Sequence, residues 1–492
     1  MRRLMPAHNA SDLSIESSNP TANTSVTNEW WTPRLAGPVI AAAVIRFTLL
    51  AITLARNGTS ALFQVDPGTY LEPGRNLILH GCFAVDGVPD LLRTPGYPLF
   101  LAITSLAGFP AAAVANVILS VFSVILVWKL GRATFSYPRI ALGAAWIFAF
   151  EPMSVVYSVC LTSETLFLAL FLLSIERLTM FLHGRNLPVL AAAGLWLAAA
   201  TYVRPVTYYL PVTLAFGLFL VLIRVPGLRW KAPAVLLISV MPWLAAWQIR
   251  NWLETGYSGF SSVTEVNLYF LNAAEVTARV EHRSFSEVSR SLGYFGGVNY
   301  GEQAYLYQPY LALHPEQTGW SQGRRLLYIR SEAFHVIRAH YGVYLLQCVV
   351  MPLFKTIVNP GAGNFNHLLY PEDPGPNVGL VNENPVRLAI RLIKEYPWAA
   401  TQRLVFEFVL CGLYLLAARG IILVVRGVYR DRIHNLCFWL LLGTSLYFLA
   451  VTGVGGGPGA DARYRLPIMP AVCIFAAAGF RRTIRQSHST VS

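Results

Sequence analysis

"AAAVANVILSVFSVILVWKLGRATFSYPR" covers residues 111–139 and joins a long apolar run to a short basic loop. An α-helix needs about 20 apolar residues to cross the hydrocarbon core of a bilayer, and the run 111–130 has that length. The loop 129–139 that follows carries three basic side chains and no acid. Basic loops of this kind gather on the cytoplasmic side of a membrane. The stretch therefore predicts a membrane-spanning helix that ends at the cytoplasm.

The composition extends this interpretation to the whole chain. The sequence has 492 residues, of which 55% are hydrophobic and only 13% charged, and its mean hydropathy is +0.48. Soluble domains carry roughly 25% charged residues, so the chain is predicted to be an all-α polytopic membrane protein. The net charge of +13 is explained by basic cytoplasmic loops, and we expect no nucleic-acid partner.

Ten apolar runs are long enough to predict membrane-spanning helices. They are 35–55, 111–130, 140–158, 164–182, 188–203, 206–223, 233–250, 404–425, 434–453 and 466–480. The first run is expected to act as an uncleaved signal-anchor. A further apolar stretch, 341–358, holds Gln347, Pro352 and Lys355.

The short loops predict the orientation. The basic segments are 129–139, 224–231, 426–432 and the tail from residue 481. Ten crossings with the N-terminus inside place all of them in the cytoplasm, as the distribution of basic residues requires. An eleventh crossing would not, so we place 341–358 in the membrane interface as a continuation of 323–342.

This topology divides the chain into five parts. They are a disordered cytoplasmic tail (1–34), a transmembrane catalytic module (35–250) with a first outer loop (56–110), outer loops with interfacial helices (251–403), C-terminal transmembrane helices (404–480) and a cytoplasmic tail (481–492). Long segments between helices are usually functional. The chemistry is therefore expected on the outer face of the membrane.

Ionisable and aromatic side chains collect at that outer level. They are Asp66, Tyr70, Arg93, Tyr97, Glu151, Glu164, Arg204, Arg250, Arg463 and Arg465. Charged groups at membrane depth are costly and usually functional. The alternatives stay open for each: an arginine at a helix end can extend to lipid headgroups, Glu164 can cap a helix, and "DPG" at Asp66 is good turn chemistry.

The order of these residues resembles a known family. An apolar span is followed by Asp66 and Tyr70, then by "RTPGYPLFLA" (93–102), "SETLF" (163–167), "RP" (204–205) and "RYRLPIMP" (463–470). This order resembles the GT-C glycosyltransferases that use polyprenyl-phosphate sugars, in the bacterial branch related to protein O-mannosyltransferases and aminoarabinose transferases. The resemblance covers roughly 35–270, returns at the last span, and is weak over 271–430.

The resemblance implies a GT-C-like helical bundle whose first outer loop forms juxtamembrane helices. It also implies that Asp66 is the catalytic aspartate. Several members have Asp-Glu there, whereas this chain has Asp66-Pro67, so Glu72 or Glu164 is a candidate for the missing glutamate. The implied location is the bacterial cytoplasmic (inner) membrane, with the active site facing the periplasm or exterior. The implied partners are a polyprenyl-phosphate sugar, a lipid, glycan or protein acceptor, and membrane lipids.

The residue types suit this chemistry. A carboxylate can take the proton of an acceptor hydroxyl, and arginine suits a departing phosphate because its planar fork binds two oxygens. No Gly-rich nucleotide loop is evident, and the six cysteines show no metal-ligand or disulfide pattern. The donor is already activated, so no nucleotide is needed; no cofactor is assigned, and a divalent cation is the one candidate. No metal ligands are assigned.

Two other functions compete with an inverting glycosyltransferase that uses Asp66 as base. A flippase or transporter for a lipid-linked sugar would show paired repeats and polar residues at the bilayer midplane. No clear repeat is present, and Arg46 and Glu407 are the charged exceptions within spans. A polysaccharide polymerase or ligase would share the donor and the compartment, and the long loop 251–336 keeps that alternative open.

Overall fold

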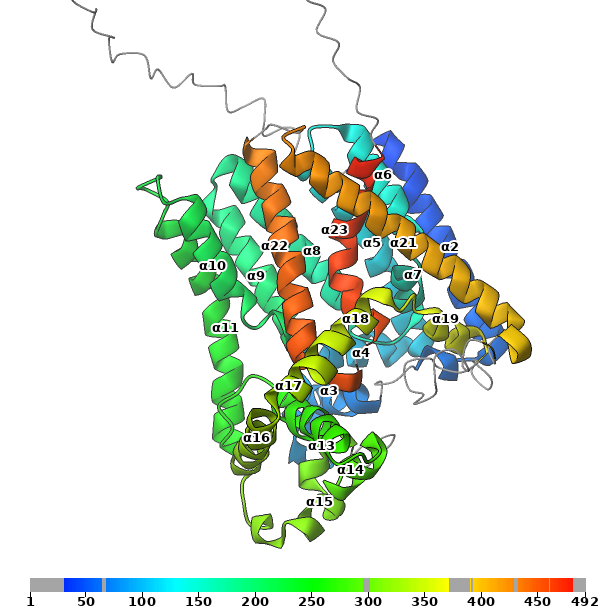
Figure 1. Cartoon of the computed structure of the whole chain (residues 1–492). Helices are drawn as coiled ribbons and strands as arrows, with labels where there is room; N and C mark the ends of the chain where they lie inside the picture. The colour runs from blue at the N-terminus through cyan, green and yellow to red at the C-terminus, as the bar shows by residue number, and fades with distance from the viewer. Residues whose placement is uncertain are drawn as a thin grey trace, which may run out of the picture.

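The structure, a computed structural model, is almost entirely helical (Figure 1). It describes residues 31–63, 68–294, 301–370, 390, 393–428, 432–459 and 461–480. Asp66, residues 1–30 of the predicted N-terminal tail and the predicted tail 481–492 lie outside these ranges. The predicted all-α membrane fold is confirmed.

Seven helices in the described part of the chain are long and apolar enough to cross a membrane. They are Pro33–Asn57 (with α2, Ala36–Asn57), α5 (Phe109–Thr134), α8 (Glu164–Gly184), α11 (Lys231–Thr255), Tyr341–Val358, α21 (Pro397–Val425) and Ile433–Gly455 in α22 (Arg432–Gly455). A bent pair, α6 (Pro138–Ala149) and α7 (Pro152–Val159), forms one more candidate span. Three predicted spans are shorter helices: α9 (Leu187–Val203), α10 (Leu210–Val221) and α23 (Met469–Gly479).

The helices form one bundle whose direction alternates along the chain. Figure 1 shows the start of α2 and the end of α23 at the same end of the bundle. The described parts of the first loop and of the segment between α11 and α21 lie at or below the opposite end. The predicted number of ten membrane crossings and the cytoplasmic location of both tails stay predictions. We refer to the end that carries these loops as the lower end.

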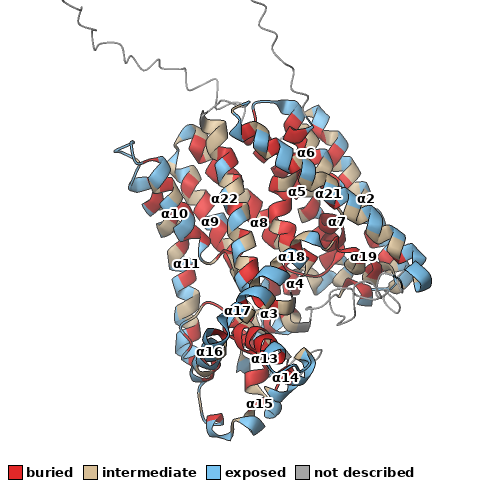
Figure 2. Ribbon diagram, viewed as in Figure 1, coloured by how far each residue is buried: buried red, intermediate tan, exposed pale blue. Residues whose placement is uncertain are grey.

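Burial follows the membrane environment. Figure 2 shows buried residues concentrated along α5 and α8, in the middle of the bundle. The outer helices instead expose large apolar side chains, including Phe216, Ile238 and Phe408. In water such a surface would be costly, but lipid is as apolar as these side chains. Glycines allow close packing where α21 meets α23, since a Cβ at Gly420 would collide with the carbonyl oxygen of Phe475.

The break between α6 and α7 has a local cause. Pro152 cannot continue a helix from α6, and the two helices meet at 53°. Glu151 caps the new helix, because its carboxylate accepts from the backbone N–H groups of Met153 and Ser154 at 3.2 and 2.6 Å. On the other side of the break, Arg46 donates to the carbonyl of Ala149 at 2.8 Å. These side chains replace the backbone bonds that the break removes.

The first loop contains two short helices and a small hairpin at the lower end of the bundle. Helix α3 (Gly68–His80) packs on α4 (Gly96–Thr104), and strands β1 (Ala84–Val85) and β2 (Val88–Pro89) pair between them. The predicted juxtamembrane helices are therefore present.

A separate apolar core holds the outer segment after α11. The described residues between α11 and α17 form helices, most of them short, that share an apolar cluster with Leu91 and Leu92 of the first loop. The elements are α12 (Val263–Val266), a π-helical turn η5 (Asn267–Ala273), α13 (Ala274–Val280), α14 (Phe285–Ser291), η6 (Gly301–Leu306), α15 (Gln308–Leu313) and α16 (Gln322–Ala339). We call this part the outer domain. The outer domain packs against the first loop through this cluster.

The chain returns to the bundle through α17 (Tyr341–Tyr344), η8 (Leu345–Val350), α18 (Met351–Val358) and α19 (Ala362–Leu369). The segment Tyr341–Val358 passes the length and apolarity criteria for a membrane span, although the sequence analysis placed it in the interface. In Figure 1 it runs obliquely, and it contacts the lower part of α22 and η10 (Ala462–Ile468). Its interfacial placement stays a prediction.

Candidate active site

Glu164 is the first residue of α8 and is buried. The turn before it is held on two sides, because Asn116 donates to the carbonyl of Cys160 at 2.8 Å and the N–H of Leu161 donates to the carbonyl of Leu62 at 2.9 Å. A carboxylate at this position also meets the positive end of the helix dipole. The local structure therefore fixes a buried negative charge at the lower end of the bundle.

Arg204 pairs with this carboxylate from the end of α9. Pro205 disfavours helical geometry at the preceding residue, and Arg204 is extended, with φ −143° and ψ 124°. The break turns the arginine out of the helix, and its Nη1 forms an ion pair with Glu164 Oε1. Its guanidinium carbon lies 6.0 Å from the centre of the Phe167 ring. The "RP" pair thus serves to project a cation onto Glu164.

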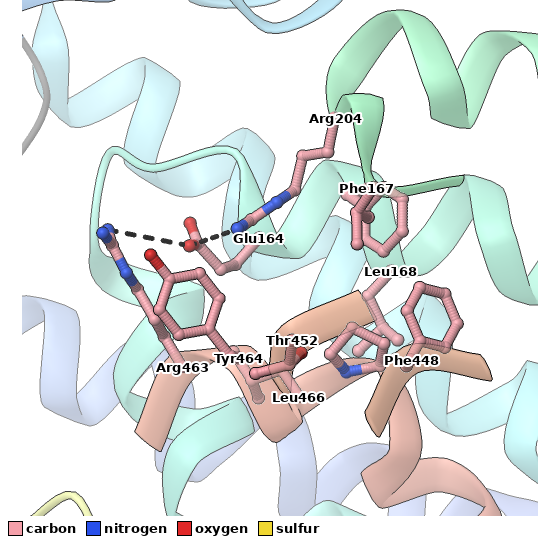
Figure 3. A pocket seen from close by; sticks show the side chains of 11 residues that line it. Glu164, Phe167, Leu168, Arg204, Phe448, Thr452, Arg463, Tyr464 and Leu466 are labelled. Atoms are coloured by element: carbon pink, nitrogen blue, oxygen red, sulfur yellow. Dashed lines mark ion pairs between the residues drawn. The ribbon is translucent and has the colours of Figure 1, made fainter. Parts of the chain in front are cut away.

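Arg463 approaches the same oxygen from the C-terminal part of the chain. It belongs to η10, whose start is capped by Asp461 through a 2.6 Å hydrogen bond from the N–H of Ala462. Its Nη1 lies 4.0 Å from Glu164 Oε1. Figure 3 shows the two guanidinium groups on opposite sides of the Glu164 carboxylate. Three charged side chains that are distant in sequence therefore meet at one point.

A pocket lies beside this cluster, and the space between its lining atoms is about 350 Å³ when the open solvent at its mouth is included. It is lined by Glu164, Phe167, Leu168, Arg204, Val206, Phe448, Thr452, Arg463, Tyr464, Leu466 and Pro467. The charges lie at one side, and Phe167, Leu168 and Phe448 gather at the other (Figure 3). We call this the arginine pocket. It suits a molecule with an anionic head and an apolar chain.

The first loop borders the cluster through Tyr70. Its hydroxyl lies 3.5 Å from the hydroxyl of Ser163, the residue before Glu164. Arg93 donates to Tyr70 Oη at 3.2 Å and to Thr69 Oγ1 at 2.9 Å. The edge of the buried Tyr97 ring packs on Tyr70, with ring centres 4.9 Å apart. Tyr70, Arg93 and Tyr97 of the first loop therefore lie together beside Ser163, next to the arginine pocket.

The glycine of "RTPGYP" is required by close packing. A Cβ at Gly96 would lie 2.7 Å from the carbonyl carbon and oxygen of Tyr202. Tyr202 belongs to the last turn of α9, which ends just before Arg204. The motif therefore places the start of α4 directly on the backbone that carries Arg204.

Two predicted arginines lie elsewhere. Arg250 donates to the carbonyls of Phe83 and Asp90 at 2.7 and 3.2 Å and forms a 2.7 Å ion pair with Glu254. It fastens the first-loop hairpin to the end of α11. Arg465 is buried and donates to the carbonyl of Thr356 at 3.0 Å and to that of Asn359, which satisfies the end of α18.

The candidates for the missing glutamate also separate. Glu72 accepts from the backbone N–H of Asp86 at 3.0 Å, on the hairpin side of α3. Glu164 instead lies in the cluster. Asp66 lies outside the described residues, but Phe63 and Gly68 on either side of its segment are described, and Tyr70 follows four positions later.

Two acidic residues near these groups escaped the sequence analysis. Asp461 caps η10 and also accepts from Asn364 at 3.2 Å. Asp90 is buried in the first loop. Burial raises the pKa of the Asp90 carboxyl to about 6, while hydrogen bonds from the N–H groups of Leu92 and Arg93 and the charges of Arg93 and Arg250 act in the opposite direction. The only sequence signal for Asp90 is its position three residues before Arg93.

The described residues contain no group of three or more His, Cys, Asp or Glu side chains that could hold a metal ion. Glu164 is already paired with two arginines, so its surroundings do not fit a divalent cation. The six cysteines, all among the described residues, form no disulfide bond.

One comparison, with a protein-family profile, agrees with the predicted resemblance. The profile of the family described as dolichyl-phosphate-mannose-protein mannosyltransferase matches residues 93–247, which is less than half of the chain. The matched segment includes Arg93, Glu164 and Arg204 and excludes Asp66 and Arg463. Comparison with curated protein sequences gives no match.

Two similar solved structures are crystal structures of ArnT from Cupriavidus metallidurans, one in the apo state and one bound to undecaprenyl phosphate. Each is 14% identical to this chain, and each alignment covers 90% of this chain and 78% of the ArnT chain. The TM-scores are 0.37 and 0.35. The profile match confirms that this multi-pass membrane protein resembles the GT-C glycosyltransferases over residues 93–247, and it supports a transferase that takes its sugar from a lipid-phosphate-linked donor.

Proposed function

We propose that the protein transfers a sugar from a polyprenyl-phosphate-linked donor to an acceptor hydroxyl, at the outer face of a bacterial inner membrane. The acceptor oxygen attacks the anomeric carbon, and the bond from that carbon to the phosphate oxygen breaks. Asp66 accepts the proton of the acceptor, and polyprenyl phosphate leaves. A direct displacement of this kind inverts the anomeric configuration.

The observation that carries this proposal is the convergence of Arg204 and Arg463 on Glu164. Two arginines and one carboxylate have a net charge of +1, which complements the single negative charge of a phosphodiester. The cluster is partly shielded from water, where charge-assisted bonds to a phosphate are stronger. As the leaving phosphate gains negative charge, the arginines stabilise it further. Such differential binding lowers the barrier of the transfer.

The rest of the pocket supports the same donor. Phe167, Leu168 and Phe448 form an apolar side next to the charges, where the first isoprene units of the donor would lie. Arg93 and Tyr70 border the cluster from the first loop. Asp66 precedes Tyr70 by only four residues in the sequence, and Tyr70 contacts Ser163 beside the cluster, which supports the role of Asp66 as the base.

The test is the consumption of radiolabelled polyprenyl-phosphate hexose and pentose by native membranes, which contain the acceptor. We expect Asp66→Asn to reduce turnover roughly 10²-fold or more while the protein stays folded, because a general base contributes about that much. Asp86→Asn is the matched control. Asp86 is an exposed acid in the same loop, and its positive φ of 50° suits asparagine. Turnover by Asp66→Asn within about tenfold of wild type would refute the assignment of the base.

The outer-face assignment has its own test. Single cysteines replace Arg229, Arg290 and Val428 in a background without native cysteines, and intact cells are treated with an impermeant thiol reagent. The proposal expects labelling at 290 alone. Labelling at 229 or 428, or none at 290, would place the arginine pocket on the other side of the membrane.

A further inference from the structure

Asp90 is a buried carboxylate that makes no contact with the arginine pocket. It is 1% exposed, and its Oδ1 accepts from the backbone N–H groups of Leu92 and Arg93 at 2.7 and 3.2 Å. These two bonds form an Asx-type turn that ends at Arg93. The Asp90 side chain therefore holds the backbone of Arg93 in place.

The same oxygen is also bound from the outer domain. Gln303, in η6, donates its Nε2 to Asp90 Oδ1 at 2.9 Å. Ser261 and Ser262 hold the next two residues, through bonds to the carbonyls of Leu92 at 2.7 Å and Leu91 at 2.8 Å. The segment that precedes Arg93 is thus fastened to a domain that lies outside the bundle.

The side chain of Arg93 points the other way, toward α3. Its Nε and Nη1 donate to Thr69 and Tyr70, and its guanidinium carbon lies 4.4 Å from the centre of the Tyr70 ring. Tyr70 in turn reaches Ser163 beside Glu164. Contacts therefore run without a gap from Gln303, through Asp90 and Arg93, to the edge of the arginine pocket.

We propose that Asp90 is a positioning residue through which the outer domain holds Arg93 and Tyr70 in the geometry that binds the donor phosphate. This proposal rests on the proposed function, since it names the outer domain as a part of the donor site. In a site of this kind a displacement of about 1 Å can cost about 10²-fold in rate. The outer domain would then control activity without touching the donor.

A merely structural role for Asp90 would lower folding yield and leave donor affinity unchanged in the protein that folds. Three variants separate the two roles. Asp90→Ala removes the acceptor of all three bonds. Asp90→Asn retains an Oδ1 that can accept them. Gln303→Ala cuts the connection to the outer domain and leaves the turn to Arg93 intact.

The measurements use purified full-length protein in nanodiscs, with a polyprenyl phosphate as the probe. Affinity is measured by thermal shift, and hydrogen exchange is followed in peptides that contain Tyr70 and residues 91–97. We expect Asp90→Ala and Gln303→Ala to weaken the probe's affinity about tenfold and to raise exchange in both peptides. Asp90→Asn should restore both quantities to near wild type. Asp86→Asn, on the exposed hairpin turn, should change neither.

Wild-type affinity in Gln303→Ala, with unchanged exchange at Tyr70, would overturn the proposal, and this variant decides the matter if Asp90→Ala does not fold. Failure of the proposed function gives a different result. In that case the wild-type protein would not bind the polyprenyl phosphate, while raised exchange at Tyr70 in Gln303→Ala would still demonstrate the coupling between the outer domain and the first loop.

Discussion

Arg204 and Arg250 both stand at the lower end of a membrane helix, yet their surroundings differ. Around Arg204, a second arginine and a shared carboxylate meet beside a pocket with an apolar side. Around Arg250, two backbone carbonyls and Glu254 take up the guanidinium donors. Both arginines lie near the end of a membrane helix, but only the surroundings of Arg204, which we call the first region, have a charge cluster next to a pocket. The surroundings of Arg250, with the first-loop hairpin and Asp90, form the second region. The difference separates an arginine that can bind a ligand from one that fastens a loop.

The largest expected effect comes from removing an arginine of the first region. We expect Arg204→Ala to lower kcat roughly 10²–10³-fold, the usual cost of losing a donor that stabilises developing negative charge. Arg465→Ala should instead lower the melting temperature, because it leaves the carbonyls of Thr356 and Asn359 without their donor, a loss of roughly 1–3 kcal/mol. The measurement is turnover at saturating donor, normalised to folded protein.

Arg56→Ala is the control for headgroup binding. Arg56 is exposed near the lower end of α2, and its guanidinium lies over the ring of Tyr370. It should keep full kcat. If Arg204→Ala also kept full kcat and donor KM, the arginine pocket would not be the donor site.

The first region was largely predictable because its signals are local. Apolar runs gave the helices, "RP" marked the end of α9, and "RTPGYP" marked the start of α4. The sequence analysis grouped Glu164, Arg204 and Arg463 at one depth, and the structure brings them together. It grouped Arg250 and Arg465 with them as well, because sequence shows where an arginine stands but not which carbonyls lie within its reach.

The outer domain was not predictable for a related reason. Its core joins Leu91 and Leu92 to residues more than 150 positions later, and no local period reports such a contact. The burial of Asp90 follows from that contact, so its role was invisible. The break at Glu151 has another cause. Glu151 is the only charged residue in the run 140–158, so the sequence predicts one continuous span, whereas the structure has a break between α6 and α7.

The next effect concerns Asp90, in the second region, and the pH dependence of protein stability. Burial raises the pKa of the Asp90 carboxyl from its ordinary value of 3.8 to about 6. An acid whose pKa is raised on folding binds more protons in the folded state, so stability declines as the pH rises from about 4 through about 6. The ionised group then costs roughly 3 kcal/mol at neutral pH. Asp90→Asn removes this cost and should raise the melting temperature at pH 7.5.

The gain should shrink toward pH 5, where the wild-type carboxyl is protonated. The charged and titratable groups that face Asp90 are Arg93, Arg250 and Tyr305. None of them is expected to change its charge between pH 5 and 7.5, so the trend reports Asp90. Melting curves of both proteins at four pH values test this. A difference that does not vary with pH would show that Asp90 does not titrate in this range.

A smaller effect tests the packing of α4 against the end of α9. Gly96→Ala would place a Cβ 2.7 Å from the backbone of Tyr202, and overpacking of this kind costs roughly 1–3 kcal/mol. Because that backbone carries Arg204, donor affinity should fall together with the melting temperature. Gly184→Ala is the matched control, since no atom lies within 4 Å of the added Cβ. Equal melting temperatures for the two variants would contradict the close packing.

The smallest expected effect has the opposite sign. In the proposed site, Glu164 and the donor phosphate would both bind Arg204 and Arg463, so the carboxylate competes with the phosphate. Glu164→Gln changes the net charge of the cluster from +1 to +2, so it should bind polyprenyl phosphate about tenfold more tightly, by roughly 1.4 kcal/mol. Tighter binding of the leaving group slows its release, so turnover at saturating donor should fall while product inhibition increases. Both quantities can be measured in nanodiscs with added polyprenyl phosphate.

Glu72→Gln is the matched control, because Glu72 is an acid of the first loop that faces the hairpin rather than the pocket. It should leave affinity and turnover unchanged. The informative contrast lies between Glu164→Gln and Arg204→Ala. If both weakened the binding of polyprenyl phosphate, Glu164 would serve mainly to hold the two arginines in place. If Glu164→Gln strengthens binding while Arg204→Ala weakens it, the carboxylate competes with the phosphate, and the ion pair in this structure is the state of the site before the donor enters.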